Sequence, residues 1–474
     1  MARKRRRKIV ENLTITGLAD RGKGLARDAE GRVIFVEGQV APGDVVDVLI
    51  TKKRSAFWQG FVVSFRQMSP ERVQPFCEHF GSCGGCTYQH LPYEAQLRYK
   101  EQRVREILQR IGQVEPRDFL PILPAEPSVH YRNKMEFAFS NRRWLTAEEL
   151  VRPEISNKAE VLGFHRAGAF DKIVPIETCY LQGDPSNEIR NYLGELARKQ
   201  GLPFFDIKAG RGMMRHLLIR LTTIGEIMLI VSFFRDETEK IKNYLDAVLE
   251  RFPQITSLFY CINPKANDYI LDLDLKLYHG RPYIEEQLNH LRFRIQPKSF
   301  FQTNTRQAVR LFDAIIDFAE LDGSQTVYDL YTGVGSIALY LAHKSKKVIG
   351  IEEVADAIVD AEENARLNGI TNCTFYAGDV RKVLDPSFAE RHGKPDLIIT
   401  DPPRAGMHQD VVDFLIDLGA PQIVYVSCNP ATQARDVQML SQAYELIKVQ
   451  PVDMFPHTFH VETVALLQRR QGKS

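Results

Sequence analysis

The sequence lacks any long uninterrupted hydrophobic run. Charged residues make up 26% of its 474 residues and interrupt it too often for a transmembrane span. Six of the first eight residues are Arg or Lys, but no apolar segment follows this basic tail as it would in a signal peptide. We therefore expect a cytoplasmic protein with no membrane partner.

The sequence also has little net charge and no cysteine pattern typical of a disulfide framework. Its 62 basic and 60 acidic residues leave a net charge of +2, so overall charge does not indicate nucleic-acid binding. The seven Cys residues are an odd number in a long chain, which favours reduced thiols, a metal site or catalysis. A hydrophobic content of 44% and roughly 150 residues per domain predict about three well-packed domains.

Residues 9–68 read as a small all-β domain. Short β-rich runs are separated by Gly, Pro and Asp turns such as 20–24 and 42–44, which predicts a five-stranded barrel of the OB type, a common nucleic-acid platform. A structural or protein-binding barrel is the alternative. The basic tail (residues 1–8) and the run 52–54 favour contact with a polyanion.

Residues 69–292 predict a central α+β domain with helices over 93–109 and 237–250. The candidates for phosphate contact are Arg132, Asn133, Lys134, Lys208, Arg211, Arg215 and His216. Because RNA bases stack on aromatic rings, the candidate platforms are Phe164, His165, Phe170, Phe300 and Phe301. A solvated basic face is the alternative reading of the first set, and nothing local ranks the second.

A cysteine cluster opens this central domain. Cys77, Cys83 and Cys86 have a spacing that suits zinc or an iron–sulfur cluster. No second C-x2-C pair is present, so a fourth ligand has to come from elsewhere in the chain. By spacing alone, Cys179, Cys261 and His79 remain open for that role.

From about residue 293 to 474 the pattern changes to buried strands that alternate with helices. The expected strands are 326–331, 347–351, 373–377, 397–400 and 422–427. Apolar runs without alternation, spaced by helices, predict a parallel α/β sheet covered on both faces. Ligands bind at the carboxyl ends of such strands, so we expect a Rossmann-like domain with its site there.

The first three strand ends indicate a nucleoside cofactor. A glycine turn at Gly333 and Gly335 follows the first strand, Glu352 ends the second, and Asp379 follows the third. Glu352 is placed to bind ribose hydroxyls and Asp379 an adenine amino group. Leu339 stands where a third glycine would favour NAD, so S-adenosylmethionine is preferred, with an NAD-dependent dehydrogenase as an alternative.

The last strand ends carry candidate chemistry. Asp401 opens Asp-Pro-Pro-Arg, Cys428 follows the fifth strand, and Glu462 lies in an apolar final strand. A thiolate that adds to C6 of uracil makes C5 nucleophilic, and a base must then remove the C5 proton. We expect Cys428 as the nucleophile and Glu462 as the base, with Asp401 orienting the uracil or the thiol.

Five segments in this region together resemble the RNA uracil-5-methyltransferase family: 301–304, 329–335, 401–406, 427–430 and 460–463. The resemblance implies that Gln302, Tyr331, Glu352 and Asp401 contact S-adenosylmethionine. It also implies Cys428 as nucleophile and Glu462 as proton acceptor. Ser336, which stands where some relatives have Asn, is a further candidate for cofactor contact.

The resemblance extends to the N-terminal half. Members with an N-terminal TRAM barrel carry the same cysteine spacing plus one Cys roughly ninety residues later, and hold a [4Fe-4S] cluster. This implies Cys77, Cys83, Cys86 and Cys179 as its ligands. Barrel and cluster together resemble the enzymes that methylate 23S ribosomal RNA. The thymidine loop of tRNA and a non-catalytic RNA-binding scaffold remain alternatives, and a monomer is expected.

Overall fold

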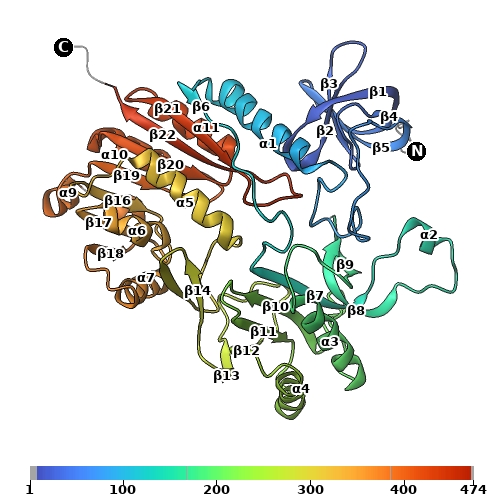
Figure 1. Ribbon diagram of the computed structural model, residues 1–474. Helices are drawn as coiled ribbons and strands as arrows, with labels where there is room; N and C mark the ends of the chain where they lie inside the picture. The colour runs from blue at the N-terminus through green and yellow to red at the C-terminus, as the bar shows by residue number, and fades with distance from the viewer. Residues whose placement is uncertain (1–7, 167, 385, 471–474) are drawn as a thin grey trace, which may run out of the picture.

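The computed structural model describes residues 8–166, 168–384 and 386–470. The basic residues 3–7 of the predicted tail lie outside the described residues. Figure 1 shows a small barrel at the N-terminus, a central sheet, and a larger C-terminal sheet flanked by helices. In the described part of the chain, no helix is long and apolar enough to cross a membrane.

The N-terminal barrel is closed, as predicted, by five strands in the order β1-β2-β3-β5-β4. Alternate side chains point inward, including Ile34 and Val36 of β3 and Val46 and Val48 of β4, all fully buried. The strands are β1 (Ile9–Leu18), β2 (Gly24–Arg27), β3 (Val33–Glu37), β4 (Val45–Lys53) and β5 (Phe57–Gln67).

The central region is a seven-stranded sheet in the order β13-β12-β11-β10-β7-β8-β9. Its strands are β7 (Lys134–Arg142), β8 (Lys158–Arg166), β9 (Ala169–Pro175), β10 (Met214–Leu221), β11 (Ile227–Phe233), β12 (Ser257–Ile262) and β13 (Lys276–Gly280). Helices α3 (Ser186–Lys199) and α4 (Thr238–Arg251) bury their apolar faces in the same core as β10 and β11. The short α2 (Ala147–Leu150) lies on an excursion between β7 and β8 (Figure 1).

The C-terminal sheet has the order β18-β17-β16-β19-β20-β22-β21-β6. The five strands from the β18 edge inward are parallel, as predicted: β16 (Thr326–Leu330), β17 (Lys347–Glu352), β18 (Cys373–Ala377), β19 (Leu397–Thr400) and β20 (Gln422–Ser427). The antiparallel strands β21 (Tyr444–Val452) and β22 (Glu462–Arg469) follow. The chain direction of crossovers reverses between β16 and β19, where open α/β sheets bind their ligands.

Helices cover both faces of this sheet (Figure 1). They are α5 (Thr305–Ala319), α6 (Ser336–Leu341), α7 (Ala355–Leu367), α8 (Val380–Val383), α9 (Pro386–His392), α10 (Gln409–Leu418) and α11 (Pro430–Leu440). Helix α5 starts where predicted because the Asn304 side chain accepts a hydrogen bond from the Gln307 N–H at 3.1 Å. Its apolar stripe, including Leu311, Phe312 and Ile315, is fully buried.

Two elements of the predicted central region pack with the C-terminal sheet instead. Helix α1 (Tyr93–Ile107) contributes Val104 to the core beneath β16 and β20, and β6 (Asp118–Phe119) pairs with β21 at the sheet edge. The hairpin of β14 (Ile284–Leu288) and β15 (Leu291–Ile295) shares one core with β11 and α5. The predicted boundary at 292/293 falls inside this hairpin, so the two regions share a continuous interior.

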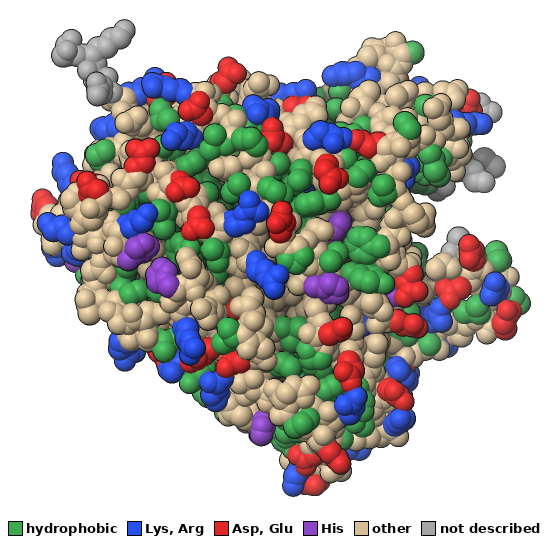
Figure 2. Space-filling model, in the orientation of Figure 1, with side chains coloured by type: hydrophobic (Ala, Val, Ile, Leu, Met, Phe, Trp, Pro, Cys, Tyr) green, Lys and Arg blue, Asp and Glu red, His purple; other side chains and the backbone are tan. Residues whose placement is uncertain are grey.

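Charge on the molecular surface is mixed. On the face shown in Figure 2, Lys and Arg alternate with Asp and Glu rather than forming a field of one sign. This agrees with the net charge of +2. Any recognition of a polyanion by this chain therefore rests on local groups rather than on the overall potential.

Candidate active site

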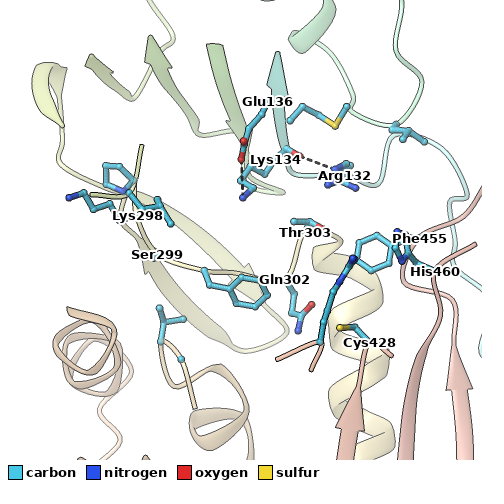
Figure 3. Close-up of a pocket in the computed structure, with 18 of the residues that line it drawn as sticks. Arg132, Lys134, Glu136, Lys298, Ser299, Gln302, Thr303, Cys428, Phe455 and His460 are labelled. Atoms are coloured by element: carbon cyan, nitrogen blue, oxygen red, sulfur yellow. Dashed lines mark hydrogen bonds and ion pairs between the residues drawn. The ribbon is translucent and has the colours of Figure 1, made fainter. Parts of the chain in front are cut away.

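One large cavity, about 1580 Å³ in volume, lies between the C-terminal sheet and the central region. Seven of the predicted site residues line one end: Gln302, Tyr331, Gly333, Glu352, Asp401, Cys428 and Glu462. The four predicted cluster cysteines line the other end. Figure 3 shows Gln302 and Cys428 on one wall, with Arg132, Lys134 and Glu136 projecting from the opposite side.

Strand register brings Cys428 and Glu462 together. Strand β20 pairs antiparallel with β22, and Ser427 lies opposite Thr463. One step further, Cys428 follows the end of β20 where Glu462 begins β22, so the two residues face each other across the strand pair. The Thr463 hydroxyl locks this register by donating to the Gln433 side chain at 2.6 Å.

The turn that carries Cys428 is fixed from both sides. The Asn429 N–H donates to the Ser427 hydroxyl at 3.1 Å, and the Asn429 side chain caps α11 by accepting from the Ala431 N–H at 3.2 Å. Pro430 at the first helical position suits this cap. The Asn429 amide also donates to the Arg404 carbonyl at 3.0 Å, which ties the Asp-Pro-Pro-Arg loop to the cysteine turn.

The acidic groups at this end share an enclosed environment. Burial raises the pKa of Glu462, while the Arg404 guanidinium opposes that shift. Burial also raises the pKa of Asp401 well above its usual range, and the charges of Glu462 and Asp329 add to the effect. Two neighbouring carboxyl groups cannot both ionise cheaply in such a site. The free protein therefore holds a proton on this pair near neutral pH.

The Cys428 thiol is half-buried beside the same carboxyls. Burial, followed by the charges of Glu462 and Asp401, raises its pKa to about 11, while Arg404 acts in the opposite direction. The resting group is thus a protonated thiol. Ionisation at neutral pH requires a proton acceptor within the site, and the carboxyl pair is the group placed to serve.

The glycine turn after β16 and Glu352 both line the cavity, and hydrogen bonds join them. The Gly333 N–H donates to the Glu352 carboxylate at 3.1 Å, and the Val354 N–H donates to its other oxygen at 3.0 Å. Tyr331 adopts a left-handed backbone with φ of 64° just before this turn. A side chain at Gly335 would approach Ala361 at 3.0 Å, so this glycine permits close packing of α6 on α7.

Two predicted cofactor contacts lie outside the set that lines this cavity. Ser336 is the first residue of α6, directly behind Gly335. The Asp379 side chain caps α8 by accepting from the Arg381 N–H at 3.0 Å, and it also pairs with the Arg381 guanidinium. That pairing and the cap hold the pKa of Asp379 at about 2. In this structure Asp379 therefore serves its own helix.

At the far end of the cavity, Cys77, Cys83, Cys86 and Cys179 are free thiols that face one another. Burial is the main cause that raises the pKa of Cys83 to about 11 and of Cys86 to about 12, with further increases from the neighbouring thiols. His79 instead accepts a hydrogen bond at Nε2 from the Glu177 N–H at 3.2 Å. Cys261 is fully buried in the central sheet, away from this set.

The wall between the two ends carries Phe455, which no motif singled out, and His460, which opens the predicted segment 460–463 but was given no role of its own. The Phe455 and His460 rings lie above Cys428 with centroids 5.9 Å apart (Figure 3). Burial and nearby cations lower the pKa of His460 to about 4, so its ring is neutral. They come from the segment 453–461, whose composition shows only an ordinary turn. Phe455 therefore has no sequence signal, and the position of His460 beside it arises from the fold.

The predicted basic contacts divide into two groups. Arg132 and Lys134 line the cavity, and the Lys134 ammonium pairs with Glu136 at 3.3 Å. Arg215 is wholly buried and donates to the Asn263 carbonyl at 2.7 Å, so the prediction that it contacts phosphate was wrong. Its charge had suggested an exposed position, but the Arg215 side chain in β10 is buried inside the central domain.

Comparison with known proteins identifies the family. The model of the tRNA (uracil-5-)-methyltransferase family matches residues 272–381 and 390–470, and the TRAM domain matches residues 4–63. A protein of Porphyromonas gingivalis named as an uncharacterized RNA methyltransferase is 51% identical, over 96% of this chain and 99% of its own. One from Bacteroides thetaiotaomicron is 48% identical, over 96% and 100%.

A solved structure matches nearly the whole molecule. The tRNA (uracil-54, C5)-methyltransferase of Pyrococcus abyssi, in complex with S-adenosyl-L-homocysteine, has a TM-score of 0.73 and 29% sequence identity, covering 96% of this chain and 99% of that one. The chain belongs to the RNA (uracil-5-)-methyltransferase family. This membership confirms the resemblance drawn from the five sequence segments, and the barrel is a TRAM domain.

Proposed function

We propose that this protein transfers a methyl group from S-adenosylmethionine to C5 of a uridine in RNA through a covalent Cys428 adduct. The observation that carries the proposal is the pairing of β20 with β22, which sets Cys428 against Glu462 at the cavity that also contains the Gly333 turn. Nucleophile, base and nucleoside pocket thus open onto one space, which the chemistry requires.

The sequence of bond changes assigns one role to each residue. The Cys428 sulfur bonds to C6 of the uracil, and the electron pair of the C5–C6 bond makes C5 nucleophilic. S-adenosylmethionine, when bound, supplies the electrophilic methyl group to C5. Glu462 then takes the remaining C5 proton, the C5–C6 double bond re-forms, and the thiolate leaves.

The shifted pKa values determine which groups in the site accept and release protons. The thiol of Cys428 has to lose its proton as sulfur bonds to C6, and the raised pKa of the Asp401–Glu462 pair makes that pair a competent acceptor near neutral pH. The pair then has to release this proton to water, so that Glu462 is ionised again when the C5 proton has to be taken. Burial of Glu462 suits the later step for the same reason, because a carboxylate with a raised pKa is a stronger base.

The residues that fit S-adenosylmethionine are Gln302, Tyr331, Gly333, Glu352 and Asp401, all of which line the cavity. Glu352 supplies carboxylate oxygens where a ribose would lie at the end of the second strand. The Pyrococcus relative, solved with S-adenosyl-L-homocysteine, supports this assignment. Ser336 and Asp379 remain weaker candidates because neither lines the cavity and Asp379 is already paired.

Four thiols at the other end fit a [4Fe-4S] cluster held by Cys77, Cys83, Cys86 and Cys179. All four are described, and no three of their sulfurs lie within 4.8 Å of one another. Two sulfurs bound at about 2.3 Å to one tetrahedral zinc ion would lie about 3.8 Å apart, so the wider spacing favours a larger group. The cluster, when bound, cross-links the segment 77–86 to the central domain.

For the target we propose a uridine of 23S ribosomal RNA, on the resemblance of barrel and cysteine set to the ribosomal enzymes. A uridine of tRNA is the second candidate, because a tRNA enzyme spans the same architecture. Mapping 5-methyluridine by mass spectrometry in separately purified 23S ribosomal RNA and tRNA, from wild-type and deletion strains, tests both. Loss of one site from ribosomal RNA supports the first, and loss from tRNA alone supports the second. No loss from either contradicts the proposal.

A further inference from the structure

Two histidines and an aspartate from distant segments converge outside the active site. His165 comes from β8, His216 from β10, and Asp268 from the loop that follows β12. One ligand atom from each of the three lies within 4.8 Å of the others, and within the described residues this is the sole group of three or more metal-ligand side chains so close together. Cys77, Cys83, Cys86 and Cys179 do not belong to this group.

The distances within this group match metal coordination better than hydrogen bonding. His165 Nε2 lies 3.4 Å from Asp268 Oδ2, and His216 Nε2 lies 3.3 Å from Asp268 Oδ1. Nitrogen–oxygen hydrogen bonds are usually about 2.7–3.2 Å long. Two ligands bound at about 2.1 Å to one tetrahedral ion lie about 3.4 Å apart.

The proton on His165 is placed away from the aspartate. Its Nδ1 lies 3.0 Å from the Phe170 carbonyl, which can only accept, so Nδ1 carries the hydrogen in this contact. In the neutral ring, Nε2 then turns a lone pair toward the Asp268 carboxylate. A cation between the two removes that repulsion, and an imidazole with its second nitrogen bonded to a carbonyl is the usual form of a metal-bound histidine.

A hydrogen bond from Arg215 holds the Asp268 carboxylate in place. The Arg215 guanidinium donates to Asp268 Oδ1 at 3.0 Å and is itself anchored by the carbonyls of Asn263, Lys265 and Asn267. Carboxylates that bind metals are commonly hydrogen-bonded in this way. The buried arginine thus fixes the loop over residues 263–268 so that Asp268 faces both imidazoles.

The group opens onto a second cavity of about 370 Å³, which has room for an ion and its waters. His165, His216 and Asp268 line it together with Cys83 and Gly85, which also line the large cavity. His165 and Asp268 are about two-fifths exposed, so an ion could enter from solvent without unfolding the domain.

We propose that His165, His216 and Asp268 bind one divalent transition-metal ion, of the class that two imidazoles and a carboxylate select, with water completing its coordination. The ion joins the loop over residues 263–268 to β8 and β10 and is distinct from the group held by the cysteines. The sequence indicated His165 only as a platform for base stacking, because its partners lie 51 and 103 residues away along the chain.

Zinc binding by the full-length protein, purified anaerobically with its iron content intact, tests the site. After loading with Zn²⁺ and removal of excess, the wild type is expected to retain one more zinc per chain than H165A, H216A or D268N. Loss of an outer partner alone costs metal sites about 10- to 100-fold in affinity, so loss of a ligand should weaken zinc binding by at least that factor. His279→Ala, an exposed histidine of the same sheet, is the matched control and should retain the zinc.

A spectroscopic measurement on the wild type keeps the test independent of variant folding. Co²⁺ bound here should give ligand-field bands without a thiolate charge-transfer band, and Zn²⁺ should displace it. Equal zinc content in the wild type and all three variants, or a Co²⁺ spectrum of thiolate character alone, overturns the proposal. Iron content should stay the same in every variant, so failure of this site is distinguishable from failure of the proposed cysteine cluster.

Discussion

Both ends of the large cavity contain buried acidic groups with raised pKa values, but the groups are carboxyls and one thiol at one end and cysteine thiols alone at the other. At one end, burial raises the pKa of Asp401, Glu462 and Cys428. At the other, burial raises the pKa of the cluster cysteines such as Cys83 and Cys86. In both places the charged forms are costly until a positively charged group arrives. The buried acidic groups at both ends therefore favour binding of a cationic partner.

The ends differ in what the partner does. Iron at the thiol end would bind permanently and displace the protons once, at assembly. At the carboxyl end the groups have to gain and lose a proton in every turnover, so a pair with shared, raised pKa values is the suitable device. Substitutions at the two ends should therefore have different effects: loss of turnover at the carboxyl end, and loss of bound iron and of stability at the thiol end.

Glu462→Gln removes the cycling base. We expect turnover on RNA to fall by about 10²–10⁴-fold, the usual contribution of a general base. Asp401 remains to accept the thiol proton, so sulfur attack and methyl transfer still proceed, and a covalent protein–RNA adduct that carries the methyl group should accumulate. Denaturing gel electrophoresis with labelled methyl donor measures it. Glu362→Gln, on the exposed face of α7, should behave as the wild type, and normal turnover by Glu462→Gln would refute the role of the base.

Cys179→Ser removes the proposed fourth ligand of the iron–sulfur cluster at the other end of the cavity. We expect loss of bound iron and about 2 kcal/mol of stability, which lowers Tm by about 4–8 °C for a domain of this size. The iron assay and calorimetry check this. Cys373→Ser, which lies in β18 and keeps its contact with the Ala338 carbonyl, is the control. Full iron content in Cys179→Ser would show that the fourth ligand is another residue.

The carboxyl pair predicts a pH dependence of stability in the ligand-free protein. Because the pKa values of Asp401 and Glu462 are raised in the folded state, the fold binds a proton that the unfolded chain releases above about pH 4. The free energy of unfolding should therefore fall as pH rises from there toward the raised pKa, by about 1 kcal/mol per pH unit.

Asp401→Asn isolates this smaller effect. With one carboxyl removed, the decline in unfolding free energy between pH 5 and pH 8 should flatten, although methyl transfer is also expected to suffer. Urea denaturation across this pH range measures the slope. Glu320→Gln, at the exposed end of α5, should leave it unchanged. An identical slope in Asp401→Asn and the wild type would mean that the pair carries no shared proton.

The sequence predicted the position of the turns correctly because their signal is local in the chain. The turns at Gly333, Asp401 and Cys428 each follow a buried apolar strand, and parallel strands bring such turns to one edge. The barrel could be predicted for a similar reason, because its strands alternate and its turns contain glycine and proline. The comparisons confirm the family resemblance drawn from these segments, and the roles of the individual residues remain predictions.

What the sequence did not reveal depends on contacts between distant segments. Strand β6 is two residues long and is a strand only because it pairs with Lys448 and Val449. The burial of Arg215 depends on carbonyl groups in a loop about 50 residues away. His165, His216 and Asp268 meet only after the central sheet forms, so no short motif records them.

The most direct measurement is covalent capture on RNA that contains 5-fluorouracil. Fluorine at C5 cannot be removed as a proton, so an attacking thiolate remains bonded to C6. The wild type should form a denaturant-resistant complex that contains a methyl group, with the cross-link on Cys428 by peptide mass spectrometry, and Cys428→Ala should form none. A cross-link at another residue, or an undiminished complex with Cys428→Ala, would contradict the proposed mechanism.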